Sequence, residues 1–198
     1  MASDARTTKD RLLRGLAMAG VALLVALAVF WWFAPRALRV KAGDLAPDFA
    51  LPHFNQPTSR GTLSGLRGEP VVLVRFDSRW PSSGPYLTEL EKIHRRFLRD
   101  GLVVVGVALD PAAEQRALEF VLHNRDVTFT VLLDPDGAVT GPLYGMPRGQ
   151  AETYVIGADG RVRSAHPTVR RWTTPAEMSG LGALLPTPTP TAAATPSS

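Results

Sequence analysis

The sequence predicts an α/β domain with a mixed central sheet flanked by helices, preceded by one transmembrane helix. Three observations lead to this prediction. Residues 15–34 carry no charged side chain. Apolar, β-branched runs then alternate with segments of helical spacing between residues 71 and 133. Two short strand-like runs flank a glycine-containing turn within 154–163 and indicate a closing hairpin. Strands that alternate with helices and end in a hairpin form a mixed sheet between helices.

The first half of the domain contains a strand, a helix and a second strand. Val71–Phe76 is mostly apolar and β-branched, as in a buried central strand. From Leu87 onward apolar residues recur at helical spacing, and Gly101 is expected to end that helix. Residues 102–109 form the next apolar run and predict a second buried strand.

The second half begins with Asp110, which is expected to cap a helix that has Pro111 in its first turn and runs to about residue 124. The later predicted elements are, in order, a strand at 129–133, a turn at 134–137, hairpin strands at 154–156 and 161–163, and a last helix that runs from the capping box of Thr174 and Glu177 to about residue 184.

Composition divides the chain into segments. These are an N-terminal segment 1–14, the transmembrane helix 15–34, a linker 35–42, the α/β domain 43–184 and a Pro/Thr/Ala-rich tail 185–198. Because the tail has too few large apolar residues to form a core, we expect it to be extended or flexible.

The apolar stretch 15–34 is long enough for a membrane span, about 30 Å at 1.5 Å per residue. Trp31, Trp32 and Phe33 stand at its end, where aromatic rings favour the membrane interface. The basic residues before the stretch favour a cytoplasmic N-terminus, which predicts a single-pass protein of the inner membrane with a periplasmic domain. A cleaved signal peptide with its site at 26–28 is the alternative, and the aromatic cluster that follows favours a retained anchor.

Small residues form a stripe on the predicted transmembrane helix. Gly15, Ala19, Ala22 and Ala26 are spaced by four, three and four residues, so they share one face. Such a stripe lets another membrane helix approach closely. The alternative is that alanine is simply common in these helices.

Charge excludes nucleic acid as the partner. The net charge is +4, but residues 1–41 carry seven basic and two acidic side chains, whereas the remainder carries fifteen basic and sixteen acidic ones. A nearly neutral domain lacks the basic surface of a phosphate binder. The sequence also shows no nucleotide-binding glycine motif and no paired histidine or calcium-loop spacing, so we expect no cofactor and no metal.

Several short motifs occur in a specific order. They are a G-x-x-A-P-D-F-x-L pattern at 43–51, the stretch 63–68, the strand at 71–76, Glu89-Leu-Glu-Lys92, the strand at 102–107 and the hairpin residues 154–156 with Asp159-Gly160. In these motifs, over about residues 42–166, the chain resembles membrane-anchored thioredoxin-like proteins of the TlpA/ResA type, within the redoxin and AhpC/TSA superfamily. The resemblance implies a thioredoxin-like fold.

The resemblance also implies a W-C-x-x-C motif after the first core strand, and this motif is missing. The chain contains no cysteine. The family's two cysteine positions fall near Trp80 or Pro81 and near Ser83 or Gly84, and we call residues Trp80, Pro81, Ser82, Ser83 and Gly84 the degenerate redox site. Thiol–disulfide exchange requires a thiolate, which serine does not supply.

A second family feature is missing before the hairpin. The resemblance implies a cis-proline at the position of Ala151. Because a non-proline cis bond costs about 2.5–4 kcal/mol, we expect a trans peptide at Ala151, which completes the degenerate redox site.

Other chemistry finds little support. Ser82 and Ser83 are expected to cap the helix rather than act as nucleophiles, since no histidine stands at a suitable distance. Asp77, Arg79 and Glu152 are expected to cluster near the degenerate redox site as a surface ion pair, because no second carboxylate has a spacing suited to acid–base catalysis.

The sequence therefore predicts a non-enzymatic, membrane-anchored subunit. It would scaffold an integral-membrane complex, respiratory or photosynthetic, on the periplasmic side, and its partners would be that complex and the bilayer. An assembly factor that holds a peptide or apo-protein in the former redox groove is the alternative. An enzyme with non-thiol chemistry is a second alternative.

Overall fold

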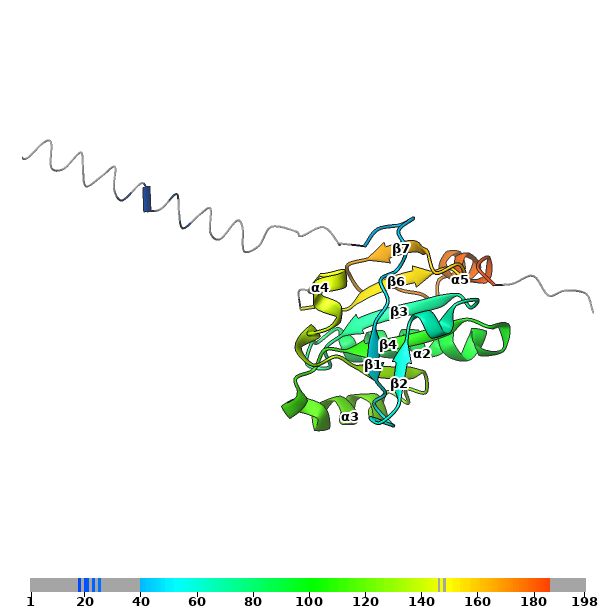
Figure 1. Ribbon diagram of the computed structural model, residues 1–198, viewed down its shortest axis with the longest axis horizontal. Coiled ribbons are helices and arrows are strands. Elements are labelled where there is room, and N and C mark those ends of the chain that lie inside the picture. The colour runs from blue at the N-terminus through cyan, green and yellow to red at the C-terminus, as the bar shows by residue number, and fades with distance from the viewer. Residues whose placement is uncertain are drawn as a thin grey trace, which may run out of the picture. The chain divides into compact units, whose positions relative to one another are not determined.

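The computed structural model describes residues 40–145, 147 and 149–185, together with Met18, Gly20, Val21, Leu23 and Val25 (Figure 1). The chain divides into two units, Met1–Ala37 and Leu38–Ser198, and each is considered by itself. The five described residues of the first unit are helical and exposed. Within the described part of the chain, no helix is both long and apolar enough to cross a membrane.

Several predictions concern residues that lie outside the described ones, and they stay predictions. These residues are the segment 1–14, the stripe of Gly15, Ala19, Ala22 and Ala26, the interface residues Trp31, Trp32 and Phe33, and the tail after residue 185.

Five strands form the central sheet of the second unit in the order β5-β4-β3-β6-β7. Their bounds are Val71–Phe76 (β3), Val103–Ala108 (β4), Thr130–Leu133 (β5), Glu152–Ile156 (β6) and Val162–His166 (β7). β3, β4 and β5 are parallel, β6 is antiparallel to β3, and β7 is antiparallel to β6. The sheet is therefore mixed, as the sequence predicts.

The helices are α2 (Ser83–Phe97), α3 (Gln115–Asn124), α4 (Thr140–Tyr144) and α5 (Pro175–Gly182). After a 3₁₀ turn, Gly101 adopts a left-handed φ of 88° and ends the α2 segment, as predicted. The predicted start of α5 is also confirmed, because the Thr174 side chain accepts a hydrogen bond from the backbone N–H of Glu177.

The side chains of β3 alternate between two core clusters, one on each face of the sheet. Val72 and Val74 join the first core cluster, in which α2, α3 and α5 also bury apolar side chains. Leu73 joins the second core cluster, with Tyr144 from α4 and Tyr154 from β6. Arg75 therefore points, by alternation, towards the face of the second core cluster.

Two elements differ from the sequence prediction. Asp110 does not cap a helix: a 3₁₀ turn at Ala112–Glu114 has Pro111 as its N-cap, and α3 begins only at Gln115. A small antiparallel ribbon of β1 (Ala50–Pro52) and β2 (Arg60–Thr62) was not predicted. Figure 1 shows this ribbon in front of the sheet.

Candidate functional site

Residues 80–84 of the degenerate redox site follow β3 and continue into the first residues of α2, as the resemblance implies, and Ala151 comes directly before β6. Two successive turns build the site: Trp80 N–H donates to Asp77 O at 3.1 Å, and Ser83 N–H donates to Trp80 O at 2.9 Å. Ser83 is fully buried, and its hydroxyl donates to Asp77 O at 2.8 Å. That hydroxyl is therefore used in holding the turn and is not accessible to a substrate.

The predicted capping role of Ser82 and Ser83 is wrong in its mechanism. Ser82 stands at the N-cap of α2, but its side chain makes no capping hydrogen bond. Its Oγ is buried without a hydrogen-bond partner in the described part of the chain. The α2 N-terminus is instead held by Ser83, which bonds back to the loop.

The remaining residues of the degenerate site lie in different surroundings. Trp80 is half-buried against the second core cluster, and Pro81 is exposed. Gly84 lies close to Arg125, since a Cβ on Gly84 would be 3.1 Å from Arg125 Nε. Ala151 is fully buried in the first core cluster. No peptide bond within the described ranges is cis, so the predicted trans peptide at Ala151 is confirmed.

Two buried carboxylates meet beside this site. Asp77 and Asp110 follow the adjacent parallel strands β3 and β4, so they lie at one edge of the sheet. Asp110 accepts hydrogen bonds from the backbone N–H of Ser78, at 3.2 and 3.1 Å to its two oxygens, and from the Ser78 hydroxyl. Asp77 accepts from Arg79 through the backbone N–H and Nε, both at 2.9 Å, and through Nη2 at 2.5 Å.

The two carboxylates titrate in opposite directions. Burial raises the pKa of Asp110, and the negative charge of Asp77 raises it further, although the bonds from Ser78 oppose the shift. Burial would also raise the pKa of Asp77, but the hydrogen bonds and charge of Arg79 outweigh it and leave that pKa lowered. A second carboxylate thus lies close to Asp77, which the sequence analysis did not predict.

Arg75 on β3 and Glu152 on the neighbouring strand β6 form a buried ion pair. Arg75 Nη1 donates to Glu152 Oε2 at 3.1 Å, and Arg75 Nε donates to Thr140 Oγ1 at 3.1 Å. Thr140 Oγ1 donates in turn to Asp134 Oδ2 at 2.6 Å. The expected surface cluster of Asp77, Arg79 and Glu152 is therefore wrong for Glu152, which pairs with Arg75 in the interior.

Aromatic rings enclose this ion pair. The Arg75 guanidinium lies 5.6 Å from the centre of the Tyr144 ring, and Tyr154 OH donates to Glu152 Oε2 at 3.3 Å. Burial raises the pKa of Glu152 despite the opposing charge of Arg75, and burial likewise raises the pKa of Tyr154. Arg75 Nη2 is buried without a hydrogen-bond partner in the described part of the chain. The side chains of Arg75, Glu152 and the two tyrosines are all buried, so none of these four is exposed to a substrate.

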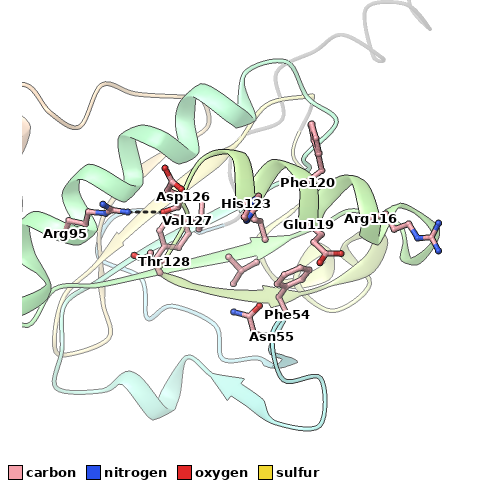
Figure 2. Close-up of a pocket in the computed structure, with 13 residues that line it drawn as sticks. Phe54, Asn55, Arg95, Arg116, Glu119, Phe120, His123, Asp126, Val127 and Thr128 are labelled. Carbon is pink, nitrogen blue, oxygen red and sulfur yellow. Dashed lines mark hydrogen bonds between the residues drawn. The ribbon is translucent and has the colours of Figure 1, made fainter.

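A wide groove lies elsewhere on the domain, between α3, the start of β5 and the segment at Phe54 (Figure 2). Its cavity measures about 1050 Å³, and none of the degenerate redox residues lines it. Figure 2 shows Phe54 and Asn55 below α3, and Arg95 joined to Asp126 through a hydrogen bond of 3.2 Å to its backbone oxygen. Phe120 on α3 is 69% exposed. The described residues contain no group of three or more histidine, aspartate or glutamate side chains arranged to hold a metal.

A comparison with protein families matches residues 42–165 to the AhpC/TSA family. The chain belongs to the AhpC/TSA family. It is also 31% identical over 151 residues to the thiol:disulfide interchange protein DsbE of Pseudomonas aeruginosa, covering 73% of this chain and 78% of that protein. The resemblance predicted from the sequence is thus confirmed at the level of the family.

Solved structures confirm the thioredoxin-like α/β fold. A protein described as a thiol:disulfide interchange protein DsbE of Chlorobium tepidum is 30% identical, with a TM-score of 0.60 over 73% of this chain and 95% of that one. Peroxidoxin BcpB of Mycobacterium tuberculosis is 22% identical, with a TM-score of 0.60 over 74% of this chain and 99% of that one. At that identity, BcpB supports the fold alone.

Proposed function

We propose that this chain is a non-catalytic, membrane-anchored member of the AhpC/TSA family that scaffolds an integral-membrane complex on its periplasmic side. One observation carries the proposal: the chain keeps a family scaffold over residues 42–165 but contains no cysteine. Its curated relative is named for thiol:disulfide interchange, a reaction that begins with a thiolate.

The degenerate redox site supports this proposal. Ser83, one of the two residues at which the resemblance could place the second cysteine, is buried, and its hydroxyl donates to Asp77 O. The adjacent charges are paired within the domain, through Arg79 with Asp77 and Arg75 with Glu152. Residues committed to internal contacts favour a structural role for this segment over substrate binding.

The anchor and the location rest on the sequence. Residues 15–34 carry no charge and are followed by a linker to the domain, which supports a single membrane span with the N-terminus in the cytoplasm.

The test is extraction of the full chain from its native membrane in a mild detergent, followed by size-exclusion chromatography. A scaffold subunit stays with the same partner chains at a fixed ratio through the column. An assembly factor is present in substoichiometric amounts, and a chain that elutes alone contradicts the proposal. A parallel insulin-reduction assay should give the rate of the buffer alone, and catalytic turnover would exclude a non-catalytic role.

A further inference from the structure

A second, smaller pocket lies where the β1–β2 ribbon covers the sheet. The helix α3, which connects β4 to β5, packs on the opposite face through Leu118 and Leu122 of the first core cluster. On the other face of the sheet, β4 and β5 are therefore not covered by α3, and the β1–β2 ribbon lies there instead. Between the ribbon and the two strands remains a cavity of about 280 Å³, which we call the ribbon pocket.

The walls of the ribbon pocket are largely apolar. Val103, Val105 and Leu132 line it from the sheet, and Leu63 and Leu66 line it from the segment after β2. Val103 and Leu66 are only half-buried, so part of this apolar wall is in contact with water. The volume lies just below the range of about 300–1,000 Å³ typical of small-molecule sites, which restricts the occupant to a small molecule.

The charged groups of the pocket have one sign. Among the described residues that line the pocket, Arg60 carries the permanent charge, His53 is the other titratable one, and none is acidic. Arg60 Nη1 donates to Ala50 O at 3.2 Å, and the ion pairs of the described residues do not include Arg60. The guanidinium is exposed and thus has donors available for an anion.

The ribbon approaches the sheet closely at Gly61, the residue after Arg60. A Cβ on Gly61 would lie 2.9 Å from Leu132 Cδ2 and 3.1 Å from His53 Nε2. A larger residue at this position would require the Leu132 or His53 side chain to shift, so glycine suits this close approach. Arg60 and the apolar side chains line the same cavity, which places a cationic group at an apolar wall.

From this juxtaposition we propose that the ribbon pocket binds a free medium-chain monocarboxylate. Its carboxylate accepts hydrogen bonds from Arg60, and its alkyl chain lies along Val103, Val105 and Leu132. This function is independent of the proposed scaffold role, because the pocket shares no residue with the degenerate redox site or with the wide groove.

Calorimetric titration of the full chain in zwitterionic nanodiscs tests the proposal, with sodium octanoate as the probe and empty nanodiscs as the blank. We expect one saturable site, with hexanoate binding more weakly by about fourfold for each missing methylene. Arg60→Gln should weaken octanoate binding about threefold to tenfold, because a charge-assisted hydrogen bond at an exposed site is lost.

Two further variants make the result specific. Thr130 is exposed and lines the pocket, so Thr130→Trp should block octanoate binding while circular dichroism confirms that the fold is kept. The matched control Arg99→Gln changes an exposed arginine of the 3₁₀ turn after α2, outside the pocket and the wide groove, and should bind like the wild type. Three results would overturn the proposal: heat equal to the empty nanodiscs, unchanged binding in both pocket variants, or equal affinity for 1-octanol.

Discussion

Arg75 occupies a strand whose six residues are all buried, from Val71 to Phe76. The sequence shows a charged residue within an otherwise apolar run, which is a signal for a buried partner. It does not show which acid supplies the counter-charge, because Glu152 is far along the chain and meets Arg75 only through the pairing of β3 with β6. The partner thus depends on sheet register, which local patterns do not specify.

A double-mutant cycle tests the energy of this pair. Glu152→Gln leaves Arg75 buried without its counter-charge and should lower the free energy of unfolding by about 3–5 kcal/mol. Arg75→Leu combined with Glu152→Gln should be less destabilised than the sum of the single variants, since no uncompensated charge remains. Chemical denaturation followed by tryptophan fluorescence measures this coupling. Additive single effects would show that the two groups do not interact.

The carboxylate pair predicts pH dependences of opposite sign. The pKa of Asp110 is raised in the folded state, so its stabilising effect is greatest at low pH and is lost as the pH rises through the folded pKa. The pKa of Asp77 is lowered, so its stabilising effect is present above the unfolded value of about 3.9 and is lost as the pH falls through the folded pKa.

Unfolding free energies measured from about pH 3 to pH 7 should separate these effects. Relative to Asp110→Asn, the wild type should lose stability as the pH rises above the unfolded pKa. Relative to Asp77→Asn, it should gain stability as the pH rises towards the unfolded pKa. Wild-type and variant profiles that run parallel over this range would contradict the assignment.

Elements with strong local patterns agree with the sequence prediction. β3 spans the predicted residues, and α2 ends at a left-handed glycine as expected. The β1–β2 ribbon was missed because its strands have only three residues each, too few to show a period. Asp110 looks like a helix cap from its neighbour Pro111, but Ser78 binds its carboxylate from the adjacent strand end.

In the turn before α2, Trp80 and Ser83 are three residues apart, as the two cysteines of a C-x-x-C motif are, and a cysteine pair can test this geometry. The hydrogen bond from Ser83 N–H to Trp80 O closes a four-residue turn, whose ends lie within the Cα range of a disulfide. Trp80→Cys with Ser83→Cys should therefore form an intramolecular disulfide under mild oxidant, seen by mass spectrometry as the loss of two hydrogens.

The control pair, Trp80→Cys with Ser82→Cys, lacks this spacing and should oxidise more slowly. If the first pair stays reduced while the control pair forms a disulfide, positions 80 and 83 do not have the geometry of a redox turn, and the geometric resemblance is wrong.

The wide groove beside α3 predicts an effect on assembly without an effect on folding. Phe120 is 69% exposed and lines the groove, so Phe120→Glu should reduce partner retention on the size-exclusion column. The unfolding free energy should change by less than about 0.5 kcal/mol. Leu98→Glu is the control, since Leu98 is 59% exposed and does not line the groove. Equal retention by both variants would show that the groove is not the contact surface.

At the scale of the whole molecule, the chain keeps the fold of its family but has no cysteine for the thiol–disulfide exchange after which its relative is named. The sheet, its covering helices and the turn before α2 are present, and the entire sequence contains no cysteine. On the strands next to the turn, Arg75 and Glu152 form a buried ion pair, and within the turn Asp77 pairs with the partly exposed Arg79. The proposed function follows from this combination: the chain would act through its surfaces and its predicted anchor rather than through electron transfer.

Native mass spectrometry of the full chain, released from its own membrane in mild detergent at several dilutions, tests this account most directly. The account predicts complexes in which this chain and the same membrane partners keep one ratio at every dilution. Masses that correspond to the chain alone at every dilution would contradict it.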